Sequence, residues 1–255
     1  MLDFQTVLRQ RPAPRLRVGL ARSDNEVMEA QRLRYRVFAD ELGARLQSRV
    51  PGLDQDRYDP YCEHLLVRDE ASGRVVGTYR ILSPSASRRV GGYYSESEFD
   101  LTRLHHLRGQ MVEVGRSCID PAYRNGAVIS LLWAGLARYM NAGGHEYLVG
   151  CASIGMADGG HNAAGIYAQL AEHRAPREYR VFPRLALPLD RLTPNRRADL
   201  PPLLKGYLRV GAWICGEPAW DPDFNTADLL LLLPMSRMNK RYMRHFLKSA
   251  EPIAA

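Results

Sequence analysis

The segment from residue 110 to residue 126, QMVEVGRSCIDPAYRNG, combines a carboxylate, a guanidinium group and a potential anion site. Its β-branched apolar residues predict a strand, and the Asp-Pro pair predicts a turn into the amphipathic helix AVISLLWAGLARYM. A helix N-terminus offers free backbone N–H groups and partial positive charge, which suit a phosphate. We therefore assign Arg124, Asn125 and Gly126 as candidate phosphate-binding residues.

Glu113 and Arg116 lie on the strand predicted before this turn. A carboxylate can accept the proton of a reacting amine, and a guanidinium group can bind a carboxylate. Both residues are candidate catalytic residues, and a structural ion pair is the alternative for each. Because they are three positions apart on a strand, alternation predicts that they face opposite sides of the sheet.

The composition is that of a globular protein, with 255 residues, 45% hydrophobic and 25% charged. No apolar run approaches the length of a transmembrane helix, about 18 residues or more. The N-terminus lacks the pattern of a secretory signal peptide. We expect a single cytoplasmic domain over residues 1–255, in which about the first 14 residues are loose.

The net charge of +7 comes mostly from arginine and favours an acidic partner, either a protein or an anionic membrane surface. Nucleic acid is disfavoured, because the arginines are scattered and no nucleic-acid-binding motif is present. The four cysteines are far apart and form no C-x-x-C pair, so we expect no bound metal.

Hydrophobic periodicity, helix caps and turn residues predict one α/β domain, in which helices cover both faces of a mixed sheet. Strands are predicted at 15–21, 64–69, 75–83, 110–119, 146–153, 177–189 and 226–235, and the strand at 177–189 is interrupted by Pro183. Helices are predicted at 23–42, around 95–104, and at 127–142, 161–173, 203–214 and 236–249. The last helix is basic and amphipathic, which is typical either of a membrane-surface or carrier-binding helix or of an ordinary packing helix.

This order of elements resembles the Gcn5-related N-acyltransferase fold, which implies a mixed, mostly antiparallel sheet. The runs LRYRVFADELG, GTYRIL and EVGR are similar to those of acyl-homoserine-lactone synthases. The segment LPPLLKGYLRVGAWICGEPAWDPDFNTADLLLLL, together with GCAS and RYMRHF, is similar to ornithine N-acyltransferases that make lyso-ornithine lipid. The second resemblance extends from about residue 15 to residue 247, and we prefer it.

The resemblance implies transfer of a long-chain, 3-hydroxylated acyl group to the α-amine of ornithine. No cysteine or serine is placed well enough in the sequence for a covalent acyl-enzyme, so we expect direct attack in a ternary complex. The donor would be the phosphopantetheine arm of acyl carrier protein, with no tightly bound cofactor. Acetyl-coenzyme A enzymes of this fold have a second glycine in the phosphate turn. This chain has Gly126 alone, which leaves fewer N–H groups around a diphosphate and favours the carrier arm.

A set of charged residues is assigned to the amine substrate. An unpaired carboxylate beside five leucines would be costly at Asp228, and a substrate ammonium is one candidate partner for it. The lactone-synthase resemblance places Arg34 and Arg80 near the amine pocket, where an arginine can bind the carboxylate of ornithine. Structural ion pairs with Asp56 and Asp59 are the alternative, and a third role for these two aspartates is to bind the side-chain ammonium of ornithine. The assigned residues are Arg34, Asp56, Asp59, Arg80 and Asp228.

Three other functions stay open. The first is an acyl-homoserine-lactone synthase that uses S-adenosylmethionine, which is disfavoured because Ala44 replaces the tryptophan of that family. The second is acylation of another amino acid, such as glycine or lysine. The third is a non-catalytic module that binds a membrane or a carrier protein. For the preferred function, the basic C-terminal helix is compatible with peripheral attachment to the inner face of the membrane, because the product would be a lipid.

Overall fold

The central element is a mixed sheet in the order β1-β2-β3-β5-β6-β10-β8, in which β9 also pairs with β10. It is seen in a computed structural model that describes residues 15–238. The strands are β1 (Leu16–Leu20), β2 (Glu63–Asp69), β3 (Val75–Leu82), β5 (Met111–Ile119), β6 (Tyr147–Gly155), β8 (Trp213–Ile214), β9 (Ala219–Asp221) and β10 (Thr226–Pro234). A separate short sheet pairs β4 (Phe99–Asp100) with β7 (Phe182–Pro183).

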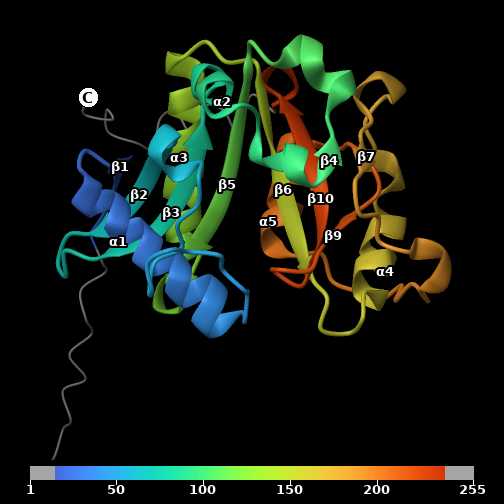
Figure 1. The fold of residues 1–255 in the computed structure, drawn as a ribbon, viewed down its shortest axis with the longest axis horizontal. Coiled ribbons are helices and arrows are strands. Elements are labelled where there is room, and N and C mark those ends of the chain that lie inside the picture. The colour runs from blue at the N-terminus through green and yellow to red at the C-terminus, as the bar shows by residue number, and fades with distance from the viewer. Residues whose placement is uncertain (1–14, 239–255) are drawn as a thin grey trace, which may run out of the picture.

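Helices cover both faces of the sheet, as Figure 1 shows with α1 in front of it and α3 behind. The helices are α1 (Asp24–Tyr35), α2 (Pro84–Val90), α3 (Ala127–Ala142), α4 (His161–Gln169) and α5 (Pro202–Val210). Alternation along β2 explains the two layers, because Leu65 packs in the core with α3 and Leu66 packs with α1. The predicted α/β fold, with a mostly antiparallel sheet and helices on both faces, is confirmed.

One pair of strands separates along its length. β5 and β6 are the parallel pair, and they pair only from Met111–Tyr147 to Glu113–Val149. Beyond this point the two strands diverge toward the bottom of Figure 1. On its other edge β5 pairs with β3, and on its other edge β6 pairs with β10. Gly150 lies where the strands begin to part, and a Cβ there would lie 2.3 Å from the carbonyl oxygen of Val114. The strands are therefore close at one end of the gap and open at the other.

A bulge in β5 turns one side chain into this gap. Gly115 pairs with Arg80 and Cys118 pairs with Thr78, so two residues of β5 lie opposite one residue of β3. The first of them, Arg116, has a φ of 51°, a left-handed conformation that is uncommon for a residue other than glycine. Alternation is lost at the bulge, and Arg116 lines the same cavity as Glu113. The prediction that these two side chains face opposite sides of the sheet is wrong.

Several predicted elements have different bounds. The helix expected over 23–42 begins after Ser23, ends as an α-helix at Tyr35 and continues as a π-helical turn over Arg36–Glu41. The strand predicted at 177–189, with an interruption at Pro183, is reduced to β7, and 3-10 turns lie on either side of it at Arg177–Tyr179 and Leu189–Arg191. Pro183 and Pro188 have no N–H group with which to extend the ladder.

The end of the chain is described only to Met238. The helix predicted over 203–214 ends at Val210, and Gly211 terminates it with a φ of 107°. Met235–Arg237 forms a short 3-10 turn, and the basic helix predicted over 236–249 lies outside the described residues from 239 onward. The same holds for the first 14 residues. Between residues 15 and 238, no helix is long and apolar enough to span a bilayer.

Candidate active site

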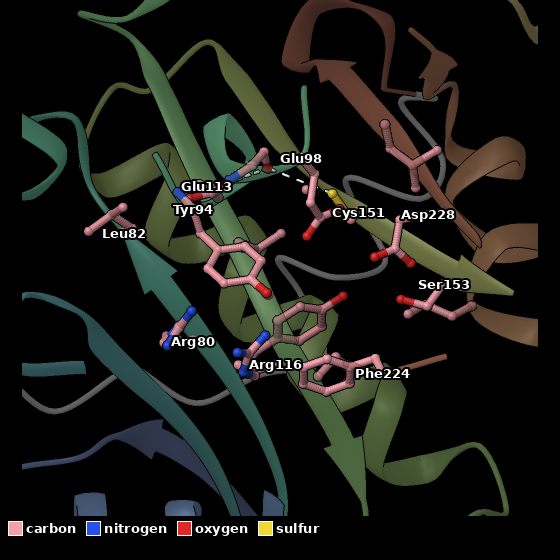
Figure 2. A pocket seen from close by; sticks show the side chains of 18 of the residues that line it. Arg80, Leu82, Tyr94, Glu98, Glu113, Arg116, Cys151, Ser153, Phe224 and Asp228 are labelled. Atoms are coloured by element: carbon pink, nitrogen blue, oxygen red, sulfur yellow. Dashed lines mark hydrogen bonds between the residues drawn. The ribbon is translucent and has the colours of Figure 1, made fainter. Parts of the chain in front are cut away.

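A cavity of about 280 Å³ occupies the gap between β5 and β6. Residues Val114 to Ser117 of β5 form one wall, and Gly150, Cys151 and Ser153 of β6 form the other. Figure 2 shows charged side chains on both sides of it, with the ring of Tyr94 between them. The parting of two strands thus creates a site that no single sequence motif encodes.

Arg34 is fully buried and anchors an ion-pair network beneath the cavity. Its Nε lies 2.8 Å from Oδ2 of Asp54, and its Nη2 lies 2.8 Å from Oδ2 of Asp59. Burial raises the pKa of Asp59, but Arg34 and Arg80 outweigh this effect and bring it down to about 2. Burial, assisted by Arg34, lowers the pKa of the neighbouring His64 to about 4, so this imidazole is neutral at pH 7.

Arg80 and Arg116 extend the network to the cavity wall. Nη1 of Arg80 lies 2.7 Å from Oδ2 of Asp56, and Nη2 of Arg116 lies 3.4 Å from the same oxygen. Nε of Arg116 also lies 3.2 Å from Oδ2 of Asp54. Burial raises the pKa of Asp56, but Arg80 and Arg116 outweigh this and lower it. Arg34, Asp56, Asp59 and Arg80 are thus brought together, in the structural ion pairs that the sequence left as an alternative.

Two aromatic rings hold the guanidinium group of Arg116. Its Cζ lies 4.8 Å from the ring centroid of Tyr94 and 4.8 Å from that of Phe224. Contacts of this kind stabilise a cation over the face of a ring. Phe224 in turn packs against Phe38 of the π-helical turn, with 5.7 Å between the ring centroids. Arg116 is therefore a fixed cation on the cavity wall.

The carboxylate of Glu113 is already occupied by hydrogen bonds. Oε2 accepts the backbone N–H of Tyr94 at 2.6 Å, and Oε1 accepts that of Ser95 at 2.8 Å and also the Ser95 hydroxyl. Burial raises the pKa of Glu113, and the hydrogen bonds from Ser95 and Tyr94 oppose the rise. Glu113 therefore ties the turn over Tyr94–Ser97 to β5, and it lines the cavity in doing so.

Three carboxylates gather on the β6 and β10 side of the cavity. They belong to Glu98, Asp221 and Asp228, and one oxygen of each lies within 4.8 Å of the others. We call these three residues the acidic cluster. Burial, followed by the charge of Asp228, raises the pKa of Glu98 to about 9. Burial also raises the pKa of Asp228, although a hydrogen bond from Ser153 lowers it.

Only Asp228 of the acidic cluster was assigned from the sequence. Glu98 lies between the 3-10 turn Tyr94–Ser97 and β4, and Asp221 ends β9, far away along the chain. The acidic run EPAWDPDF was the only signal for Asp221, and nothing in the local sequence of Glu98 distinguishes it. Asp54 and His64 were likewise missed, because their roles depend on the buried position of Arg34.

The predicted phosphate-binding junction lies at the N-terminus of α3. Gly126 is the N-cap residue, with a φ of 93°, and Oδ1 of Asn125 accepts the N–H of Ala127 at 3.2 Å. The guanidinium group of Arg124 is engaged elsewhere, in a two-pronged ion pair with Glu41 at 2.5 and 2.7 Å. Backbone geometry at Gly126, rather than a free arginine, is thus the feature that could receive an anion here.

The thiol of Cys151 lies on the β6 wall of the cavity. Its Sγ lies 3.7 Å from Oγ of Ser95. Burial, followed by the charge of Glu98, raises the pKa of Cys151 well above its usual range. A thiol held protonated in this way is a poor nucleophile.

Comparison with known proteins shows which family this chain resembles. Residues 33–134 match the model of the acetyltransferase (GNAT) domain. The chain is 35% identical to the L-ornithine N(alpha)-acyltransferase of Brucella abortus over 249 residues, which cover 91% of this chain and 88% of that protein. The enzyme of the same name from Rhodobacter capsulatus is 35% identical, over 92% of this chain and 95% of that protein.

Solved structures share the fold at low sequence identity. The CoA-dependent acyl-homoserine lactone synthase BjaI superimposes with a TM-score of 0.58 at 14% identity, over 94% of this chain and 93% of that one. The N-acyl amino acid synthase FeeM, from uncultured soil microbes, gives a TM-score of 0.55 at 14% identity, over 88% of this chain and 92% of that one. The synthase LasI gives 0.52 at 15% identity, over 95% of this chain and 100% of that one.

Proposed function

This chain belongs to the L-ornithine N(alpha)-acyltransferase family, and from that premise we propose that it acylates the α-amine of ornithine with a fatty acyl group from acyl carrier protein. It is an N-acyltransferase with the GNAT fold. The observation that supports ornithine as the acceptor is the 35% identity to enzymes named for it, over 91% of this chain. The cavity between β5 and β6 is the proposed place of reaction.

The donor would enter along the gap between the two strands. No ladder pair joins β5 to β6 beyond Glu113 and Val149, so the facing strand edges offer backbone N–H and C=O groups. The pantetheine arm carries amide groups that can pair with such edges, as an added strand does. The N-terminus of α3 follows β5 after the 3-10 turn Pro121–Tyr123, and its N–H groups can receive the single phosphate of the arm.

The acyl chain would lie in the apolar part of the cavity. Leu148, Leu203 and Leu231 line this part, which suits a long hydrocarbon chain. The hydroxyls of Tyr79 and Tyr207 lie 2.7 Å apart in the same lining. These hydroxyls are the proposed partners of a 3-hydroxyl group on the acyl chain.

The reaction would be direct attack in a ternary complex. The neutral α-amine of ornithine attacks the thioester carbonyl, the C–N bond forms, and the C–S bond then breaks. The amine proton leaves through an acceptor, for which Glu113 is the proposed residue, directly or through water, and the arm departs as a thiol. The raised pKa of Cys151 favours this route over an acyl-enzyme on that thiol.

Mass spectrometry of competing amines tests the proposal. The purified full chain would be incubated with 3-hydroxyacyl carrier protein and equal amounts of ornithine, lysine, glycine and S-adenosylmethionine. We expect the acyl mass on ornithine to dominate, fragmentation to place it on the α-nitrogen, and free carrier thiol to appear in equal amount. Dominance of another amine, or release of an acyl-homoserine lactone, would contradict the proposal. A parallel incubation with acyl-coenzyme A of the same chain length tests the choice of donor.

A further inference from the structure

The two sides of the cavity differ in charge balance. On the side of Arg80 and Arg116, the positive and negative charges of the ion-pair network are equal in number. The network pairs three arginines with three aspartates: Arg34, Arg80 and Arg116 with Asp54, Asp56 and Asp59. On the other side is the acidic cluster of Glu98, Asp221 and Asp228, and none of these carboxylates forms an ion pair within residues 15–238. Burial raises the pKa of Glu98 to about 9, so Glu98 holds a proton at neutral pH, and the remaining negative charge of the acidic cluster has no positive partner among the described residues.

Two oxygens of the acidic cluster are also buried without a hydrogen bond. Asp228 is 4% exposed, and its Oδ1 has no hydrogen-bond partner in the described part of the chain. Oε2 of Glu98 is in the same situation. Figure 2 shows the carboxylates of Glu98 and Asp228 facing the same space inside the cavity. The other side-chain hydrogen bonds of Asp228 are with Ser153, Glu98 and Thr226, and its unpartnered Oδ1 fits a donor that arrives with a ligand.

The spacing of these oxygens suits an ammonium group. One oxygen of each residue lies within 4.8 Å of the others, so a single ammonium nitrogen with hydrogen bonds of about 2.8 Å can reach all three. The third member is held in place, because Oδ1 of Asp221 accepts the N–H groups of Asp223 at 2.8 Å and Phe224 at 3.1 Å.

We propose that Glu98, Asp221 and Asp228 bind the side-chain ammonium of the amino-acid substrate and so select an acceptor with a second, cationic nitrogen. The inference rests on the proposed acylation of ornithine and assigns its specificity to these residues. With the side-chain nitrogen held as an ammonium ion, it has no lone pair for attack. The α-nitrogen is then the free nucleophile, and the cluster sets which of the two amines is acylated.

Comparison of ornithine with norvaline isolates this interaction, since norvaline is the same amino acid without the side-chain ammonium. Wild type would be measured beside Asp228→Asn and Glu98→Gln, both nearly isosteric. Asp223→Asn is the matched control, because it removes an exposed carboxylate from the adjacent loop, outside the cavity lining. We expect wild type and the control to prefer ornithine by at least ~100-fold in kcat/KM, and the preference to fall to below ~5-fold in the two cluster variants.

Each outcome has a defined meaning. Equal use of norvaline and ornithine by wild type would overturn the inference and leave the proposed acyl transfer intact. The same conclusion would follow if the cluster variants kept the wild-type thermal midpoint but lost kcat/KM equally for both amino acids. If EDTA abolishes activity and Mg²⁺ or Ca²⁺ restores it, the acidic cluster is a metal site and the inference is overturned. If no amine is acylated, titration calorimetry of wild type with both amino acids still decides. Tighter binding of ornithine would then support the cluster while the proposed function fails, and equal binding would refute both.

Discussion

Glu113 joins a turn to a strand through its side chain, and its substitution therefore acts on both geometry and chemistry. In Glu113→Gln, an amide N–H₂ group would face a backbone N–H, so at least one hydrogen bond is lost. We expect turnover to fall by roughly 10²–10⁴ with little change in the KM of the donor. Steady-state kinetics over pH 6–9 would check this.

The control for Glu113 is Glu96→Gln, which changes the next carboxylate in this region. Glu96 accepts the N–H of Tyr93 and pairs with Arg108, and it does not line the cavity. Its turnover should stay within threefold of wild type. If Glu113→Gln also stays within threefold, Glu113 has no part in the reaction. If turnover falls while the shape of the pH profile is unchanged, Glu113 positions the Tyr94 turn and is not the proton acceptor.

His64 makes the stability of the fold depend on pH. Its pKa is about 4 in the folded protein against about 6.5 in an unfolded chain. Between these values the unfolded state binds a proton that the folded state does not, so stability is fully present above about pH 6.5 and is lost as pH falls toward 4. Urea unfolding should show a loss of about 2–3 kcal/mol between pH 7.5 and 4.5 from this group.

The variant His64→Gln should lack this part of the pH dependence, because the amide does not titrate. His105→Gln is the control, since His105 is an exposed histidine in a surface turn and its loss should leave the slope unchanged. The same slope in His64→Gln and in wild type would show that another group is responsible.

At this scale the sequence identified residue types better than their roles. The sequence assigned Arg34 and Asp59 to the site, but it does not show that both side chains are buried, and their ion pair depends on that burial. The opposite-face prediction for Arg116 failed because a bulge breaks alternation, and a left-handed arginine has no sequence signature. The proximity of Glu98 to Asp228 depends on the tertiary fold and could not be predicted from the local sequence.

At the scale of elements, the N-terminus of α3 gives a test of donor binding. Gly126 has a φ of 93°, and a Cβ there would meet no atom within 4 Å. Gly126→Ala should therefore cost only the left-handed conformation, about 1 kcal/mol of folding free energy. Its methyl group would stand where an anion approaches the helix, so we expect a raised donor KM and an unchanged KM for ornithine.

A matched control exists at the other end of the same helix. Gly144 has a φ of 62° and equally open surroundings, so Gly144→Ala carries similar backbone strain away from the proposed phosphate site. Its donor KM should equal that of wild type, while both variants lose similar thermal stability. Equal changes of donor KM in the two variants would assign the Gly126 turn a purely structural role.

Elements with strong periodicity and clear caps were predicted well, and those stabilised by tertiary contacts were not. β2, β3, β10 and α3 lie close to their expected bounds, because their apolar patterns are long. The segment 177–189 has strand-like composition, but its prolines leave only β7. The gap between β5 and β6 could not be predicted at all, since it depends on two strands that diverge in space.

At the scale of the whole molecule, the net charge of +7 predicts how a carrier protein would be recognised. Acyl carrier proteins are acidic, so the encounter should be steered by charge and weakened by salt. Raising the salt concentration from low values to ~0.5 M should raise the KM for the carrier-bound donor strongly. The KM for the same acyl group on free pantetheine, the control, should change little. Long-chain acyl-coenzyme A serving as well as the carrier-bound donor would contradict this prediction.

The short pairing of β5 with β6 also has a mechanical consequence. One half of the sheet ends at β5 and the other begins at β6, and only the pairs from Met111–Tyr147 to Glu113–Val149 join them by backbone hydrogen bonds. Amide protons facing the gap should therefore exchange with solvent faster than those of β2 and β10, which are paired on both edges. A pantetheine arm laid between the halves would act as a temporary ninth strand, and its arrival should slow that exchange on β5 and β6 together. Catalysis in this protein would then coincide with the moments when its sheet is complete.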